Sequence, residues 1–507
     1  MNNQKNIVVG LDIGTTKIAC FIGQRDENGK IKIIGFGKTE SSGVERGVVK
    51  NIKDTASSIT KAVETASEQA GVTVHDVYVG IAGQHIKSIQ NMGSIIIPPE
   101  HKYIEREDID RLIEEQRNIA LPPGEDIIHI FPQNYIVDGE ELSPESNPVG
   151  VAGKQLKSNF HIVTGNTTNL LNIHDSVERA GLNIKGVVLE PIASALAVLD
   201  NTDKEAGVVL VDIGGGTTDI AIFHEGVIRH TTVLPLAGNA ITNDIKEGCK
   251  ILRPQAETLK TRFGSCLPQN VSENDIITIP GLRTQPPREI SMRTLATIIK
   301  ARTETILEQV DYEIKKSHLE KHIFAGIVLT GGGAQLKHIK ELTEFITGID
   351  ARIGLPDEHL DKDTDKEIIN TMYATGIGLV LYGFNEIDDM RQYELENEDA
   401  PDNSVDNNPK FNDSTDSSNP DELNAFGGND IFADMPQPSS TTQNDAPVFH
   451  GADDIENDKT EDFEPKSDPD KGKRRFGHQV SKAIEKYFNK VFNDGSIRNE
   501  GRDETEL

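Results

Sequence analysis

Two short segments of the chain combine an aspartate with glycine and hydroxyl residues in the pattern of a phosphate-binding turn. The first is Asp12-Ile13-Gly14-Thr15-Thr16-Lys17, which follows an apolar run. A strand would carry Asp12 to the turn, and Gly14 would leave backbone N–H groups open to a phosphate. Thr15, Thr16 and Lys17 add further donors. Taken alone, this motif fits an ordinary hairpin turn equally well.

The second segment repeats the first with more glycine. It reads Asp212-Ile213-Gly214-Gly215-Gly216-Thr217-Thr218-Asp219, and Asp212 stands 200 residues after Asp12. Three successive glycines weaken a strand pair, so we expect a ligand to approach the backbone there. The repeat indicates a duplicated domain whose two turns clamp one polyphosphate. Asp12 and Asp212 would hold a hydrated Mg²⁺, which takes few protein ligands. Asp219 has a weaker case, because it could simply cap the turn.

A third glycine turn comes late in the chain. Gly331, Gly332, Gly333 and Ala334 lie between an expected strand and an expected helix. The N-terminus of that helix would offer N–H groups, and the glycines would leave room for a flat base or a phosphate. By itself this is a plain strand-to-helix turn. The order and spacing of all three turns together favour a nucleotide site.

Alternating strands and helices must position these turns, which predicts an α/β fold. We expect strands within residues 6–23, 74–82, 85–97, 126–137, 156–164, 208–223 and 323–329. We expect helices at residues 54–70, 105–118, 169–180 and 191–199. The stretch 83–165 separates the first repeat from the second and has the character of an insertion.

Composition narrows the classes of protein. The three cysteines, Cys20, Cys249 and Cys266, have no metal-ligand spacing and suit a reducing compartment. The N-terminus has no signal-peptide pattern, and no apolar run is long enough to span a membrane. We therefore expect a cytoplasmic protein. Its formal net charge of -30 argues against nucleic-acid binding.

The C-terminal part divides into an acidic linker and a short basic segment. Residues 386–470 hold 25 acidic and four basic residues and few apolar ones, which predicts a disordered tether. Residues 471–494 predict an amphipathic helix that lies on an anionic membrane surface. A partner-binding helix is the alternative. The apolar stripe of the expected helix at residues 471–494 comprises Phe476, Val480, Ile484, Tyr487, Phe488, Val491 and Phe492, with Lys482 and Lys486 on the polar side.

The order of the three turns resembles the actin, Hsp70 and sugar-kinase superfamily. The resemblance implies ATP with Mg²⁺ as cofactors, with the first two turns on the phosphates and the third against the adenosine. Glu190 stands where the superfamily places an acid near the attacking water, although it could also be a plain helix-start acid. Glu257 and Lys260 match residues that contact ribose and base in relatives. Their alternative is an exposed ion pair one helical turn apart.

Several separated segments resemble one family more closely, the bacterial cell-division protein FtsA. They include residues 129–139 (HIFPQNYIVDG), 147–156, 79–86, 236–245 and 255–264. The resemblance implies an actin-like two-lobed fold with an FtsA-type inserted subdomain. It implies a first lobe core (1–83, with 164–197 and 365–385), an inserted subdomain (84–163), a second lobe core (198–225, with 305–364), and a small subdomain (226–304).

The same resemblance implies a function at the division site. Members bind ATP with slow or no hydrolysis, self-associate into filaments, and anchor the tubulin-like ring protein FtsZ to the cytoplasmic face of the membrane. The C-terminal peptide of FtsZ would dock on the small subdomain, where Arg302 is a candidate contact. Arg293 lies on the same expected helix. For Arg293, the stronger interpretation is that it belongs to a solvent-exposed basic face of that helix.

Two other classes of protein share the nucleotide fold. A sugar or acid kinase would need a catalytic carboxylate in a substrate cleft, for which the sequence offers no clear candidate. A chaperone ATPase would need a substrate-binding β domain, and here the acidic linker takes its place. The phosphotransferase is the alternative to the cell-division function.

Overall fold

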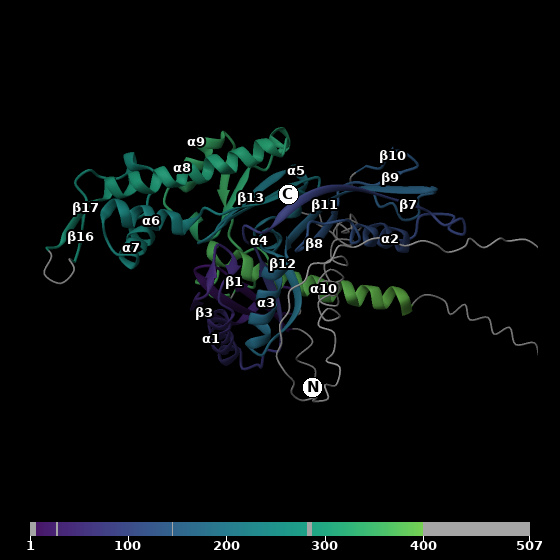
Figure 1. The fold of residues 1–507 in the computed structure, drawn as a ribbon, viewed down its shortest axis with the longest axis horizontal. Coiled ribbons are helices and arrows are strands. Elements are labelled where there is room, and N and C mark those ends of the chain that lie inside the picture. The colour runs from purple at the N-terminus through teal and green to yellow at the C-terminus, as the bar shows by residue number, and fades with distance from the viewer. Residues whose placement is uncertain (1–6, 27–28, 144–145, 281–285, 363, 399–507) are drawn as a thin grey trace, which may run out of the picture. The chain divides into compact units, whose positions relative to one another are not determined.

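The computed structural model describes residues 7–26, 29–143, 146–280, 286–362 and 364–398. These residues belong to one compact unit, and its elements are labelled in Figure 1. Three five-stranded sheets organise it. Two of them carry the repeated turns, and the third is formed by the insertion.

The first sheet has the strand order β12-β6-β1-β2-β3. Strands β1 and β2 form a hairpin, β3 extends it antiparallel, and β6 and β12 continue it parallel. Helices α1 and α3 pack together on one face, where Gly35 and Gly37 of β3 meet the backbone of α1. The bounds are β1 Ile7–Ile13, β2 Lys17–Arg25, β3 Ile31–Glu40, β4 Val44–Glu45, β5 Val48–Val49, α1 Ile52–Ala70, β6 Asp76–Ile81, α3 Thr167–Arg179, β12 Asn183–Leu189, α4 Glu190–Val198 and α10 Ala374–Glu398.

The second sheet repeats this plan in the order β15-β14-β13-β18-β19. Again an antiparallel hairpin is extended by one antiparallel strand on one side and two parallel strands on the other. The sequence repeat is therefore also a repeat of topology. The bounds are α5 Asn201–Ala206, β13 Val208–Ile213, β14 Thr218–His224, β15 Val227–Leu234, α6 Gly238–Cys249, α7 Arg253–Phe263, β16 Ile276–Ile279, β17 Arg288–Ser291, α8 Met292–Lys316, β18 Ile327–Thr330, α9 Ile339–Thr347 and β19 Ala351–Ile353.

The inserted sheet is built around the long strand β11. Strand β7 pairs along one side of it, and β8 and β9 share the other side. One face of this sheet packs against α2 in a small apolar core of its own. The bounds are β7 Lys87–Ile96, α2 Arg106–Gln116, β8 Glu125–Pro132, β9 Ile136–Val137, β10 Glu140–Glu141 and β11 Gln155–Asn166.

Helix α10 corrects the expected start of the acidic linker. The linker was expected from residue 386, but α10 continues to Glu398, so residues 386–398 are helical. Tertiary contacts explain this extension. Ile387 packs on the core of the first sheet, and Asp388 pairs with Arg25 at 2.5 Å. The remaining linker and the expected amphipathic helix lie outside the described residues.

Candidate nucleotide-binding site

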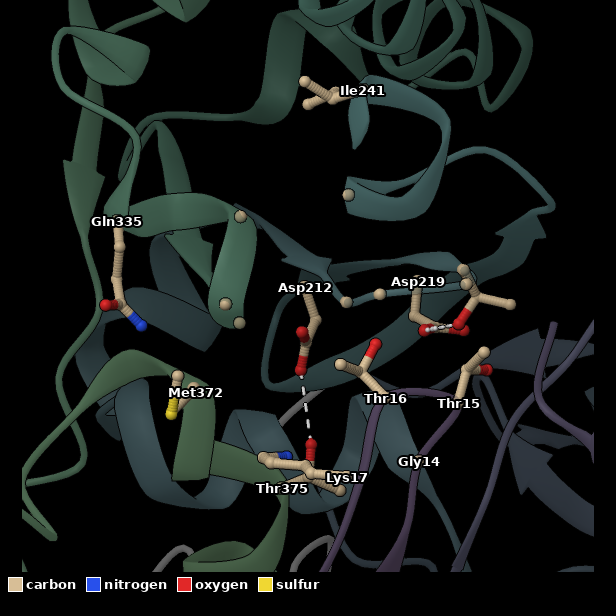
Figure 2. Close-up of a pocket in the computed structure, with 18 of the residues that line it drawn as sticks. Gly14, Thr15, Thr16, Lys17, Asp212, Asp219, Ile241, Gln335, Met372 and Thr375 are labelled. Atoms are coloured by element: carbon tan, nitrogen blue, oxygen red, sulfur yellow. Dashed lines mark hydrogen bonds between the residues drawn. The ribbon is translucent and has the colours of Figure 1, made fainter. Parts of the chain in front are cut away.

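The three glycine turns line one cavity, which has a volume of about 250 Å³. The turn between β1 and β2 and the turn between β13 and β14 face each other across it, as Figure 2 shows through Thr15, Thr16 and Asp219. The residues expected at the site that line it are Asp12, Gly14, Thr15, Thr16, Lys17, Glu190, Asp212, Gly214, Gly215, Gly216, Thr217, Glu257, Lys260, Gly331, Gly332 and Gly333.

The two aspartate turns approach so closely that only glycine fits at the contact. A Cβ atom on Gly215 would lie 1.9 Å from Oγ1 of Thr16, and one on Gly216 would lie 2.5 Å from Oγ1 of Thr15. The glycines therefore bring the two turns within reach of one ligand. In the third turn, a Cβ atom on Gly332 would meet nothing within 4 Å. Gly332 therefore borders open space at the wall of the cavity.

Carboxylates crowd the cavity. Asp12, Asp212 and Asp219 are buried, and Glu190 is half-buried at the start of α4. Burial raises the pKa of Asp219 to about 8, with a contribution from the charge of Asp212. Burial also raises the pKa of Glu190, and the neighbouring aspartates add to this. The cluster is therefore electrostatically unfavourable when all its members are ionised.

One lysine partly balances these acids. Nζ of Lys17 donates to Oδ2 of Asp12 at 2.7 Å. Burial alone would lower the pKa of Lys17, but the charges of Asp12, Asp212 and Glu190 raise it above its ordinary value. One ammonium cannot balance four carboxyl groups once they ionise, so a bound cation would favour their ionised forms.

Short polar contacts orient two of the acids. Ser194 of α4 donates to Oδ2 of Asp212 at 2.8 Å, and Thr375 of α10 donates to the same oxygen at 3.3 Å (Figure 2). Thr217 donates to Oδ2 of Asp219 at 3.0 Å, while Oδ1 of Asp219 is buried with no hydrogen-bond partner in the described part of the chain. An unsatisfied buried carboxylate oxygen that lines a cavity is a fitting ligand for a cation or its water shell.

Glu257 and Lys260 form part of a partly buried hydrogen-bond network rather than an isolated exposed pair. Nζ of Lys260 lies 2.9 Å from Oε2 of Glu257, and it also donates to the carbonyl of Gly238 and to Thr242. Thr242 in turn donates to Glu257 at 2.5 Å. The network joins α7 to the start of α6, so it fixes this wall of the cavity.

Two expected residues do not line the cavity. Thr218 is buried on β14 and donates to the carbonyl of Leu236, because alternate side chains of a strand point to opposite faces. Ala334 is buried among apolar residues of the second lobe. The third turn also differs from expectation: Gly332–Gln335 is a 3₁₀ turn, and α9 begins only at Ile339. The glycines therefore do not lie at the N-terminus of that helix.

Comparisons with known proteins agree with this geometry. The family model "Cell division protein FtsA" matches residues 209–378, and the model "SHS2 domain inserted in FTSA" matches residues 83–164. The "Hsp70 protein" model matches residues 166–232. The cell division protein FtsA of Pseudomonas aeruginosa is 38% identical over 383 residues, which cover 76% of this chain and 90% of the relative.

The chain belongs to the FtsA family of cell-division proteins. The FtsA of Neisseria meningitidis is 37% identical over 75% of this chain and 91% of its own length. Among solved structures, the PilM–PilN type IV pilus biogenesis complex matches with a TM-score of 0.53 at 15% identity, covering 74% of this chain and 98% of that one. The fold is thus actin-like, with the insertion of the FtsA family.

The expected partner contact Arg302 lies on α8, as does Arg293. Nε and a terminal nitrogen of Arg302 donate to the two carboxylate oxygens of Asp244 at 2.6 and 3.1 Å. Arg293 pairs with Glu273. Arg302 is therefore oriented by a fork-like pair and remains partly exposed.

The residues expected to contact the membrane, from Phe476 to Phe492, lie outside the described residues. Within the described part of the FtsA-type chain, no helix is long and apolar enough to cross a membrane.

Among the residues that shape the acidic cluster, the sequence offered only a weaker case for Asp219 and did not indicate Ser194 or Thr375. Asp219 pairs with Asp212 across the hairpin. That register is visible in the sequence, because Asp212 and Asp219 flank the turn symmetrically. Ser194 and Thr375 had no such signal, since their contacts with Asp212 join distant parts of the chain.

Proposed function

We propose that this chain binds ATP with Mg²⁺ in the cavity between its two glycine turns, and that it serves as an FtsA-type anchor of the division ring. The cluster of buried carboxylates between the two facing glycine turns carries this proposal. A phosphate chain would accept hydrogen bonds from backbone amides of the two turns, and a divalent cation would stabilise the carboxylates in their ionised forms.

Each residue of the site has a separate task. Asp12 and Asp212 would hold the water shell of the cation, with Asp212 oriented by Ser194. Lys17, now paired with Asp12, would donate to a phosphate oxygen. The open space beside Gly332 and the wall formed by Glu257 and Lys260 suit the adenosine. The bound cation would supply charge neutralisation at the phosphates.

Glu190 is the proposed water-positioning residue. It lines the cavity at the first residue of α4, and its carboxylate faces the field of three aspartates. A carboxylate in this position can orient a water toward a phosphate without acting as a strong base. Slow turnover is consistent with a protein that uses ATP to stabilise a filament subunit.

The partner functions rest on the family. We propose that the chain polymerises, that its small subdomain takes the acidic C-terminal peptide of FtsZ through Arg302, and that residues 471–494 bind the cytoplasmic face of the membrane at the division site. Relatives named as cell-division proteins support this over a phosphotransferase. A phosphotransferase would consume ATP only with a sugar or acid acceptor.

Calorimetry of MgATP binding tests the site. Asp212→Ala should weaken binding at least about ten-fold, because it removes a carboxylate that holds the cation's water shell. Thr218→Val is the matched control, since Thr218 begins β14 directly after that turn and its side chain does not line the cavity, and it should bind like the parent. Equal affinities in the parent and in Asp212→Ala would refute the proposed cation site.

Glu190→Gln tests the turnover role separately. It should reduce single-turnover hydrolysis without weakening MgATP binding, because the amide keeps the size of the carboxylate but accepts fewer hydrogen bonds. Unchanged hydrolysis would assign the role to another residue.

A further inference from the structure

The inserted sheet has an apolar face that packs against α2, and its opposite, polar face is buried where β8 pairs with β11. Ile130 and Ile162 belong to the core that packs against α2. On the opposite face, strand pairing aligns His129 of β8 with Val163, and Phe131 with His161 of β11. His129, Phe131 and His161 are all buried. Burying polar side chains costs free energy unless they are hydrogen-bonded, so this face calls for an explanation.

One end of the polar face holds the chain beside Glu190. The backbone N–H of Leu189 donates to Nε2 of His129 at 3.1 Å. Leu189 ends β12 and is the N-cap residue of α4, which begins at Glu190. The imidazole must therefore be neutral, with its proton on Nδ1. Burial enforces this by lowering the pKa of His129 to about 3.

Stacked rings continue from His129 across the face. The ring centroids of His129 and Phe131 are 5.3 Å apart with an interplanar angle of 18°. Those of Phe131 and His161 are 6.1 Å apart, also at 18°. The three rings form a row that connects β8 with β11, and their packing fixes each ring's rotamer.

The other end of the polar face holds the second lobe. Nδ1 of His161 accepts from Gln90, so its Nε2–H donates to Oγ1 of Thr231 on β15 at 3.0 Å. The side-chain amide of Gln133 donates to the carbonyl of Ile228 at 3.0 Å, and the backbone carbonyl of Gln133 accepts from Arg229 at 2.8 Å. Strand β15 pairs with β14, whose first residue follows the second glycine turn. The insertion therefore contacts Leu189, which directly precedes Glu190, and strand β15, which pairs with the strand that follows the second glycine turn.

We propose that His129 is a positioning residue for Glu190, held in place by Phe131, His161 and Gln133, so that the insertion sets the geometry of the hydrolytic site. We call these four residues the insert brace. The inference rests on the proposed water-positioning role of Glu190. ATP binding alone gives residues 129–133 no role. In this proposal, His129 fixes the start of α4, and Gln133 and His161 connect the insertion to β15.

The test uses three variants of the full chain. His129→Leu removes the acceptor for Leu189 N–H but keeps an apolar side chain. His129→Gln restores an acceptor near the position of Nε2. Ile130→Val is the matched control, because it trims the same strand on its opposite face and leaves the insert brace intact.

Hydrogen exchange on the nucleotide-free protein is the first measurement. The amide of Leu189 should exchange about ten-fold faster in His129→Leu, since one hydrogen bond is lost, and should return toward the parent rate in His129→Gln. Ile130→Val should exchange like the parent at this amide. Unchanged exchange in His129→Leu would overturn the brace directly.

Calorimetry and single-turnover hydrolysis are the second measurement. His129→Leu should bind MgATP with the parent's affinity but hydrolyse it several-fold more slowly, and His129→Gln should recover the rate. The double variant that combines His129→Leu with Glu190→Gln should hydrolyse ATP no more slowly than Glu190→Gln alone. If Glu190→Gln is slow but His129→Leu is not, the positioning inference fails alone. If the parent binds ATP without hydrolysing it, or if Glu190→Gln keeps the parent rate, the role of Glu190 fails and takes the inference with it.

Discussion

Replacing Asp219 by asparagine should stabilise the ligand-free protein, although the residue lines the proposed site. Its carboxyl is 3% exposed, and burial together with the charge of Asp212 raises its pKa to about 8 from the ordinary value of 3.8. Because the folded state then holds a proton that the unfolded chain releases, stability is lost as the pH rises between those two values. Asparagine carries no charge at any of these pH values, so it should escape this loss.

The size of the effect follows from the same values. Each pH unit between the two pKa values costs about 1.4 kcal/mol, so the full penalty at pH 7 approaches about 4 kcal/mol. Asp212 and Glu190 retain part of the repulsion, and the new amide nitrogen needs an acceptor. We therefore expect Asp219→Asn to raise the free energy of unfolding by about 1–2 kcal/mol at pH 8. For a folded body of this size, that corresponds to a rise of about 1–2 °C in the melting midpoint.

Thermal melts at pH 5 and pH 8 without nucleotide provide the assay. At pH 5 the gain should be much smaller than at pH 8 or absent, because less of the penalty has developed while the cost of the amide is unchanged. Asp350→Asn replaces an exposed aspartate of the same lobe and should show no pH-dependent gain. An equal gain at both pH values, or a loss of stability at pH 8, would refute the electrostatic reasoning.

Three further experiments test the remaining assignments. Gly332→Phe should keep the parent's melting midpoint, since a Cβ atom there meets nothing within 4 Å, but it should lower MgATP affinity at least about ten-fold by filling the cavity. Arg302→Glu should weaken binding of the FtsZ C-terminal peptide in fluorescence titrations while changing stability by less than about 1 kcal/mol, and Asp244→Ala, which leaves the arginine, should not weaken it. Phe488→Glu combined with Phe492→Glu should abolish sedimentation with anionic liposomes and leave ATP binding intact; sedimentation equal to the parent's would exclude this helix as the anchor.

The repeat of two turns made much of the fold predictable from the sequence. Asp12 and Asp212 stand in register because each follows a buried strand, and the structure shows the same hairpin-plus-parallel topology around both. The sequence did not show which of two neighbouring threonines faces the cavity. Thr218 follows Thr217 in the sequence, yet strand alternation turns it away from the cavity.

Long-range contacts account for what the sequence did not reveal. The acidic stretch after residue 386 reads as disordered by composition, but Ile387 and Asp388 find partners on the first lobe and extend α10. Ser194 and Thr375 orient Asp212 from two helices that lie far from it in the chain. Such contacts depend on the assembled fold, and no spacing rule reports them.

The polar face of the insertion shows how such contacts can carry function. Strand alternation places Ile130 on one face of β8 and His129 and Phe131 on the other. The second face is buried where β8 pairs with β11, and its histidines are kept neutral and hydrogen-bonded to a backbone amide of the first lobe and a hydroxyl group of the second. An apolar face would bury the same area with less desolvation, but it would fix no register between the parts. A donor–acceptor pair such as Leu189 with His129 holds only one relative position, which is the property that a site built from two lobes and an insertion requires.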